Sequence, residues 1–355
     1  MWLREGDRNP VYFHPCIKEK HRFKMPKFIL EDGYYSNDRD VVGSLDDNYF
    51  KYLLASPNPI MEAGSPRDSA SLFEIIPCSV MQEVNSKLEA IPDEAEIHDV
   101  VWSMNLDSSL GSDGFPASFY KDSWDIVKTS LISAVQNHFQ GGNIPRVACA
   151  NKIVLVPKIK DPQSLNHYRT ISLCNIPYKV LAGILNRRLA PYLPGWVSEE
   201  QHWFIKGRSI HGAIGLTQEV ISDINLKTFG SNVAIKIDMN KAFDRFEWNI
   251  IIRVLSCMVF LVWATYLLFR CFSSSWLPTT FLGRQFGFFK VVRGLRQGYP
   301  LSPSLFIITQ NVISWFFNHI DVGRIIPYRN KHRVGSISHL MFADDTIIFF
   351  NGYMR

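Results

Sequence analysis

The chain has 355 residues, of which 46% are hydrophobic and 20% are charged, so it is a globular chain with room for two or three subdomains. Its formal net charge is +5, a mild basic excess that permits nucleic-acid binding without demonstrating it. The six cysteines contain no C-x-x-C pair, which argues against zinc and redox motifs and fits a reducing compartment.

Neither the N-terminus nor the uncharged stretch at residues 254–269 suggests a membrane protein. The N-terminal residues Met1–Arg8 are mixed in charge and do not resemble a signal peptide. Residues 254–269 form an uncharged stretch, but it is shorter than the roughly 20 residues that span a bilayer. We therefore expect residues 254–269 to form one buried helix, and we expect a nuclear or cytoplasmic protein with no membrane association.

Taken in chain order, the pattern predicts three regions with boundaries near residues 95 and 230. Residues 1–95 are mixed in composition, with a basic, aromatic-containing stretch at Lys18–Lys27. Residues 96–230 contain a short buried strand at Ile153–Val156 and an apolar pattern of helical spacing from Tyr178 to Ala190. No internal repeat and no low-complexity tract marks any of the three regions.

The third region, residues 231–355, begins with a strand that ends at an acid. Val233, Ile235 and Ile237 alternate with polar or small residues, so the segment is typical of a half-buried strand that stops at Asp238. A helix from about Trp248, a β segment over 279–292, a loop at 294–303 and a helix from about Ser304 are expected next. This order predicts an α+β fold with helices on one face of a sheet.

Two further acids, Asp344 and Asp345, lie inside the apolar run His339–Phe350. Burying two neighbouring carboxylates is costly unless a counter-charge is supplied, and a divalent cation is the usual one. Hard oxygen ligands suit Mg²⁺. A strand, an Ala-Asp-Asp turn and a second strand would then place these acids beside Asp238, as two-metal phosphoryl transfer requires. A plain Asp-Asp turn between two strands is the alternative.

These segments together resemble the reverse transcriptases of non-LTR (LINE-type) retrotransposons, particularly the plant lineage. Asp238 with an aromatic five residues on, then Gly294–Pro303, then Phe342–Asp345 follow the order of three successive motifs of that family. The resemblance extends upstream, over segments that match the family's connector and fingers: Trp2–Asn9, Met104–Lys121, Lys152–Lys158, Tyr168–Cys174 and Gln201–Arg208. It covers nearly the whole chain.

The resemblance implies a right-hand polymerase. Residues 1–95 would be an N-terminal connector, 96–230 the fingers and 231–355 an incomplete palm, with the thumb absent. The reaction implied is RNA-directed DNA synthesis, in which a dNTP is added to a DNA primer on an RNA template. Asp238 and Asp344 would bridge two Mg²⁺ ions, or Mn²⁺ as a possible substitute, and Asp345 would complete the cluster. No obligate protein partner is evident.

By the same resemblance, five residues would contact the incoming nucleotide. Lys158 and Arg169 would grip the triphosphate, and the ring of Phe243 would exclude a ribose 2′-hydroxyl. Gln297 and Gly298 would lie near the template–primer and the nucleotide. For each of these residues an ordinary structural role is the alternative: surface charges, a core phenylalanine or a simple turn.

The sequence departs from the family at three places. Tyr299 replaces the usual Asp before Pro-Leu-Ser-Pro, Thr170 replaces the usual Pro after Arg169, and residues 254–269 are more apolar than expected. With a shortened palm and no thumb, we expect the isolated chain to extend a primed template poorly. A catalytically silent relic that at most binds RNA weakly therefore remains an alternative, as does a group II intron maturase. Asp244 is expected to be structural rather than a metal ligand.

Overall fold

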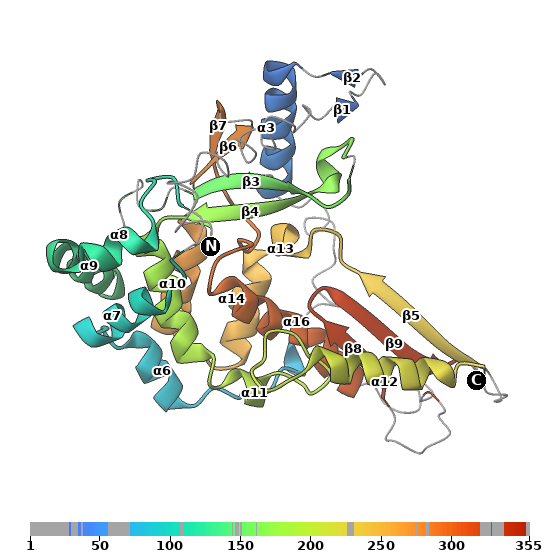
Figure 1. The fold of residues 1–355 in the computed structure, drawn as a ribbon. Coiled ribbons are helices and arrows are strands. Elements are labelled where there is room, and N and C mark those ends of the chain that lie inside the picture. The colour runs from blue at the N-terminus through green and yellow to red at the C-terminus, as the bar shows by residue number, and fades with distance from the viewer. Residues whose placement is uncertain are drawn as a thin grey trace, which may run out of the picture.

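The computed structural model describes residues 28–29, 35–36, 38–55, 72–106, 110–143, 145, 149, 151–160, 162–225, 231–274, 276–281, 284–319, 328 and 337–352. The connector motif at 2–9 and the basic stretch at 18–27 lie outside these residues. Within them, helices and β-strands alternate along the chain, which confirms the prediction of a mixed helix-and-sheet protein (Figure 1).

The first half of the chain is mostly helical. In order, its elements are β1 (Phe28–Ile29), β2 (Tyr35–Ser36), α3 (Arg39–Ala55), α6 (Gln82–Glu89), α7 (Glu94–Ser103), α8 (Ala117–Asp122), α9 (Trp124–Phe139), β3 (Asn151–Pro157), a 3₁₀ turn (Leu165–His167) and β4 (Tyr168–Cys174). Then follow α10 (Ile176–Leu189), α11 (Leu193–Trp196) and α12 (Ile210–Ser222). The apolar pattern that began at Tyr178 is thus a helix, as expected.

The second half carries most of the predicted palm elements. They are β5 (Asn232–Asp238), α13 (Ala242–Arg245), α14 (Trp248–Cys257), α15 (Val262–Ser273), β6 (Trp276–Phe281), β7 (Arg284–Lys290), α16 (Ser302–His319), β8 (His339–Phe342) and β9 (Asp345–Asn351). The strand that ends at Asp238, the helix from Trp248 and the final hairpin are confirmed.

One expected element is wrong. Residues 254–269 are not a single buried helix, because α14 ends at Cys257 and α15 begins at Val262. Val259 takes a left-handed conformation, with φ +73°, and the α15 side chain of Val262 is 87% exposed. Since neither Gly nor Pro announces the break, a count of apolar residues could not reveal it.

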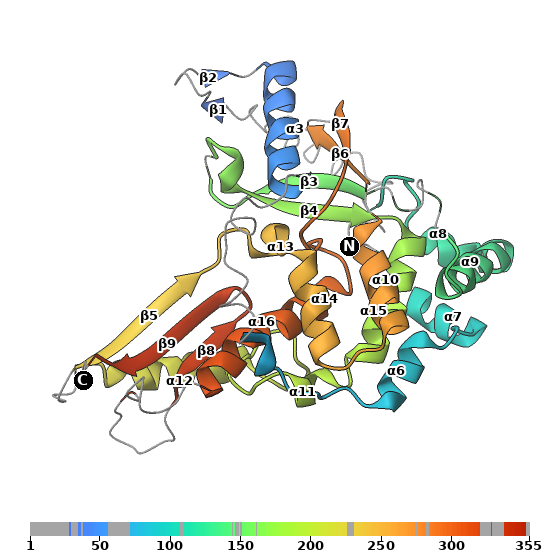
Figure 2. The same ribbon diagram turned by 180° about the vertical axis from the view of Figure 1, so that it is seen from behind.

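Two larger sheets organise the described residues. The four-stranded sheet has the order β4-β3-β6-β7, and the three-stranded sheet has the order β5-β9-β8. Figures 1 and 2 show the four-stranded sheet at one end of the molecule and the three-stranded sheet at the other, with α14 and α16 between them. Helix α3 packs against β6 and β7 of the four-stranded sheet.

Helices cover both faces of the three-stranded sheet. On one face, Leu340 and Phe349 pack with Val220 of α12. On the other, His339 of β8 shares a hydrogen bond of 2.8 Å with Ser314 of α16. Both helices run along this sheet in Figures 1 and 2. Among the residues described here, no helix is long and apolar enough to cross a membrane.

Candidate active site

Three acids lie at one end of the three-stranded sheet, which we call the acidic end. Asp238 is the last residue of β5 and is the cross-strand partner of Asp345, the first residue of β9. Asp344 lies in the two-residue turn between β8 and β9, after Ala343, whose φ is +53°. Paired residues on antiparallel strands have Cβ atoms about 4.5–5.5 Å apart. The chain therefore places acids 107 positions apart (345 − 238) side by side.

A lysine that the sequence reasoning missed lies among these acids. The Lys236 ammonium is 2.9 Å from a carboxylate oxygen of Asp345, and both side chains are well exposed. The hydrogen bond to Asp345 raises the pKa of Lys236, and the charges of Asp345, Asp238 and Asp344 raise it further. The alternation of β5 could have revealed this lysine, because residues 236 and 238 point to the same face of a strand.

The side-chain positions at the acidic end do not form a finished metal site. No three His, Cys, Asp or Glu side chains in the described part of the chain are grouped closely enough to hold an ion. The convergence of all three carboxylates on shared cations therefore stays a prediction. What the structure shows is an end of a sheet that already holds one cationic group, the ammonium of Lys236.

Phe243, the predicted sugar-contacting residue, lies on the short helix α13, just after β5. Its ring stacks on the ring of Phe306 from α16, with centroids 4.4 Å apart and planes 11° apart. Its carbonyl oxygen accepts a hydrogen bond from the Leu295 amide at 2.7 Å. The side chain is partly exposed, so one side of the ring is packed while the rest remains accessible.

Lys158 and Arg169 lie on the four-stranded sheet. Arg169 is exposed on β4, opposite Val156 of β3. Lys158 follows the end of β3, and its amide donates a 2.8 Å hydrogen bond to the His167 carbonyl. The two basic residues thus occupy neighbouring positions at the same end of the β3–β4 pair.

Gln297 and Gly298 lie directly against β4. The Ser172 amide donates a hydrogen bond of 2.9 Å to the Gln297 carbonyl. Gly298 has a φ of +98°, and a Cβ atom there would lie 3.2 Å from the Ser172 carbonyl oxygen. A residue with a side chain would be strained by the backbone and crowded by the strand, so glycine fits this position for physical reasons.

Behind this loop lies a group of enclosed ionisable residues, which we call the buried arginine cluster. The Arg296 guanidinium is over the rings of Tyr178 and Tyr299, at 5.1 and 5.4 Å from their centroids. It donates to the Phe272 carbonyl at 3.0 Å, but its Nε and Nη1 have no hydrogen-bond partner. Burial raises the pKa of the Cys271 thiol in this cluster to about 12. Tyr299, the departure from the family pattern, is therefore an interior residue.

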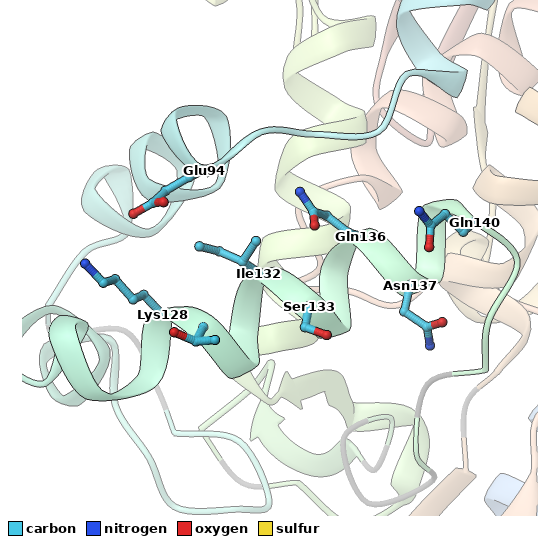
Figure 3. A pocket seen from close by; sticks show the side chains of 8 residues that line it. Glu94, Lys128, Ile132, Ser133, Gln136, Asn137 and Gln140 are labelled. Atoms are coloured by element: carbon cyan, nitrogen blue, oxygen red, sulfur yellow. The ribbon is translucent and has the colours of Figure 1, made fainter.

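A surface hollow of about 520 Å³ lies elsewhere, along the outer side of α9 (Figure 3). Its lining is mostly polar and comprises Glu94, Lys128, Thr129, Ile132, Ser133, Gln136, Asn137 and Gln140. None of the predicted site residues borders it. The chemistry of the chain therefore points to the acidic end and its neighbours.

Comparison with known proteins identifies the family. Residues 156–355, more than half of the chain, match the family described as reverse transcriptase (RNA-dependent DNA polymerase). The chain belongs to this family. The matched range begins in β3 and contains β5, the Gly294–Pro303 loop and the β8–β9 hairpin.

Curated relatives point to a particular branch. An uncharacterised 149 kDa protein of transposon TX1 from Xenopus laevis is 26% identical over 98% of this chain and 26% of its own length. A Pol polyprotein of the type-1 retrotransposable element R2 from Nasonia vitripennis is 24% identical over 68% of this chain and 22% of its own length. The prediction of a LINE-type reverse transcriptase domain is confirmed.

The plant lineage stays a prediction. A mitochondrial protein of Arabidopsis thaliana is 47% identical, but over only 15% of this chain and 45% of its own length. The chain spans about a quarter of the length of the TX1 and R2 relatives named above. None of these comparisons supports a group II intron maturase.

Proposed function

We propose that this chain carries the catalytic core of an RNA-directed DNA polymerase, which adds dNTPs to the 3′ end of a DNA primer on an RNA template. One observation carries the proposal: Asp238 and Asp345 are cross-strand partners, Asp344 adjoins them in the turn, and all three act on the charge of Lys236. In a member of the reverse transcriptase family, acids on neighbouring strand ends could supply the carboxylates that two-metal phosphoryl transfer needs.

The acidic end suits Mg²⁺, with Mn²⁺ as an alternative. Its donors are hard carboxylate oxygens, and it attracts a cationic group, since an ammonium is bound there. Asp238, Asp344 and Asp345 would hold the metal. Two bound ions would polarise the primer 3′-hydroxyl and neutralise the developing charge on the triphosphate. Because Asp238 and Asp345 are exposed or half-exposed, an ion can reach them without opening the core.

The nucleotide would lie between the acidic end and β4. The fork of the Arg169 guanidinium suits a phosphate, and Lys158 adds a point charge close by. Phe243 offers a ring that is held from behind by Phe306, so it cannot retreat easily from a ribose 2′-hydroxyl. Gln297 and Gly298 border β4 and would shape the floor beneath the base pair.

The same assignment divides the chain. Residues 96–230, with β3 and β4, would be fingers, and 231–355, with the β5-β9-β8 sheet, would be palm. Residues 1–95 would be an N-terminal connector. In this division β6 and β7 of the palm complete the sheet of the fingers, because Thr279 of β6 pairs with Ile153 of β3.

The proposal is tested by incorporation of one dNTP on a primed RNA template, with enzyme in excess so that weak template binding does not hide the chemistry. Wild type should show Mg²⁺-dependent extension. Asp238→Asn should lose roughly 100-fold or more, as is usual when a charge that stabilises the transition state is removed. Asp125→Asn alters an exposed carboxylate on α9 and should have no effect.

Two results would contradict the proposal. One is extension by Asp238→Asn at the rate of wild type. The other is no extension at all by a wild-type chain that circular dichroism and a cooperative thermal transition show to be folded, which would favour the silent relic.

A further inference from the structure

Strand β4 has an exposed face and a buried face. Arg169 is exposed, whereas the next residue, Thr170, is 6% exposed and faces inward. The Thr170 hydroxyl lies 2.9 and 2.8 Å from the two carboxylate oxygens of Asp244, to which it donates. This contact joins residues 74 positions apart and ties β4 to α13.

Asp244 immediately follows Phe243, so whatever holds this carboxylate also holds the ring. Burial raises the pKa of Asp244, and the Thr170 hydrogen bond lowers it, as do the charges of Lys241 and Lys158. The carboxylate is thus stabilised by neighbours from both the α13 turn and the four-stranded sheet. A neutral hydroxyl, rather than a cation, is its hydrogen-bond donor here, which distinguishes Asp244 from the acids of the acidic end.

The loop at 294–298 closes the same junction from the other side. The Gly294 amide donates to the Phe246 carbonyl at 2.7 Å. A Cβ atom on Gly294 would lie 2.7 Å from the Asp244 carbonyl oxygen, closer than real Cβ contacts come. Gly294 therefore lets the loop approach the backbone of α13. The α13 backbone at Phe243 and Asp244 therefore contacts this loop, while the Asp244 carboxylate contacts β4.

We propose that Thr170 and Asp244 are positioning residues for nucleotide selection: their hydrogen bond sets the distance between the Phe243 ring and the triphosphate-binding side of β4. The inference rests on the proposed function and deepens it. Arg169 would bind the phosphates, and the Phe243 ring would exclude a ribose 2′-hydroxyl. The nucleotide would therefore lie between two segments, β4 and α13, that this contact joins. Neither Thr170 nor Asp244 needs to touch the nucleotide.

The expected effect is on discrimination rather than on folding alone. If the contact is lost, Phe243 can shift relative to Arg169, and a misplacement of about 1 Å can cost up to ~10²-fold in a positioned reaction. We expect the ratio of dGTP to GTP affinity to fall roughly tenfold in Thr170→Val and Asp244→Ala, since a lost contact of ordinary strength corresponds to about that factor. Thr170→Ser keeps the hydroxyl and should retain the ratio.

The measurement is equilibrium binding of dGTP and of GTP, with Mg²⁺, to the full chain on an RNA template whose primer ends in a dideoxynucleotide. No turnover is needed. Phe243→Val is the positive control, because it removes the ring itself. Glu96→Gln is the matched structural control, because it weakens the 2.6 Å ion pair with Arg188 that joins α7 to α10, away from the junction. It should lower Tm and leave the ratio unchanged.

The outcomes separate the inference from the function. If Phe243→Val loses discrimination while Thr170→Val and Asp244→Ala keep it, the inference is overturned and the proposed function stands. If Glu96→Gln lowers the ratio as much as Thr170→Val, the effect is general destabilisation, and the inference is again overturned. If wild type binds neither nucleotide, the proposed function fails and the inference fails with it.

Discussion

The acidic end and the buried arginine cluster both concentrate ionisable side chains, but in opposite surroundings. At the acidic end, Asp345 and Lys236 are 41% and 63% exposed. In the cluster, Arg296 and Tyr299 are 6% and 2% exposed, and the guanidinium lies over two tyrosine rings and donates to the Phe272 carbonyl. Charges at the first place can exchange partners with solvent, whereas charges at the second place are fixed when the chain folds.

Under the proposed function, this difference in exposure separates the metal-binding positions from the structural ones. A metal-binding acid must be able to release one cation and accept another, which an exposed pair permits. An enclosed guanidinium cannot do so, because a buried charge is costly to separate from the few groups that stabilise it. Tyr299, the residue that departs from the family pattern, belongs to the buried, structural group. A tyrosine at this position therefore affects how the 294–303 loop is supported, not the acids.

The largest effect on stability should come from the interior. Tyr299→Ala should cost about 3–5 kcal/mol of unfolding free energy, the range for deleting a large buried ring. The ring packs on Tyr178 with centroids 5.2 Å apart and lies under Arg296, so a cavity would open beneath the loop. Urea unfolding measures the loss. Tyr52→Ala, at a side chain on α3 that is 66% exposed, is the control, and equal losses would break the comparison.

A second buried group, the imidazole of His138, should make the stability of the fold depend on pH. Burial, together with the charge of Arg270, lowers the pKa of His138 to about 4. The unfolded chain therefore binds a proton at His138 below its ordinary pKa of 6.5, while the folded chain does not until about pH 4. Stability is full above pH 6.5 and is lost as the pH falls to 4, by about 3 kcal/mol at this site.

The contribution of His138 is measured by the unfolding free energies of wild type and His138→Leu across this pH range. The variant should lose about 3 kcal/mol less than wild type between pH 6.5 and 4, because its side chain binds no proton in either state. His211→Leu, at an exposed position on α12, is the control for loss of a histidine outside the interior. Parallel slopes for wild type and His138→Leu would show that His138 is protonated within the fold.

Sequence patterns anticipated the parts of the site that depend on local order. The strand that stops at Asp238 and the hairpin at 339–351 were visible because apolar alternation ended at an acid or was interrupted by two. The pairing of Asp238 with Asp345 required one further step, the assumption that the two strands are neighbours. Lys236 was also within reach, since it shares a strand face with Asp238.

The contacts that no local pattern reports were missed. Thr170 and Asp244 meet across 74 positions, and nothing near either residue indicates the other. The Arg296 guanidinium is buried against the ring of Tyr299, and no local pattern in the sequence indicates this. The break between α14 and α15 was missed for a different reason: Val259 adopts a left-handed backbone that β-branched residues rarely take.

The cost of burying the Arg296 guanidinium, two of whose nitrogens have no hydrogen-bond partner among the described residues, can be tested directly. Arg296→Met should raise the unfolding free energy by about 1 kcal/mol or more, because an apolar side chain of similar length replaces a buried charge. Arg270→Met is the matched comparison. Its guanidinium donates to the carbonyls of His138 and Gly142, which would lose their donors, so this variant should be less stable than wild type. Destabilisation by both changes would show that Arg296 is adequately paired.

The smallest effect is expected at the acidic end, where Lys236→Met removes the resident ammonium. Without a divalent cation, Asp238 and Asp345 would then face each other directly, and like charges opposite one another on paired strands are destabilising. Mg²⁺ should bind this uncompensated end more readily than the wild-type end, where it must displace Lys236. Because a ligand that binds the folded state stabilises it, Mg²⁺ should raise the Tm of Lys236→Met more than that of wild type.

Thermal unfolding over a Mg²⁺ titration at low ionic strength measures this difference, since salt screens exposed charges. Lys87→Met is the control: it removes another exposed ammonium, whose acidic partner, Glu83, belongs to the same helix and is not part of the acidic end. Its response to Mg²⁺ should match wild type. If Lys236→Met also matches wild type, Mg²⁺ does not bind where Lys236 lies. The contrast between the exposed acids and the buried arginine would then not mark a metal site.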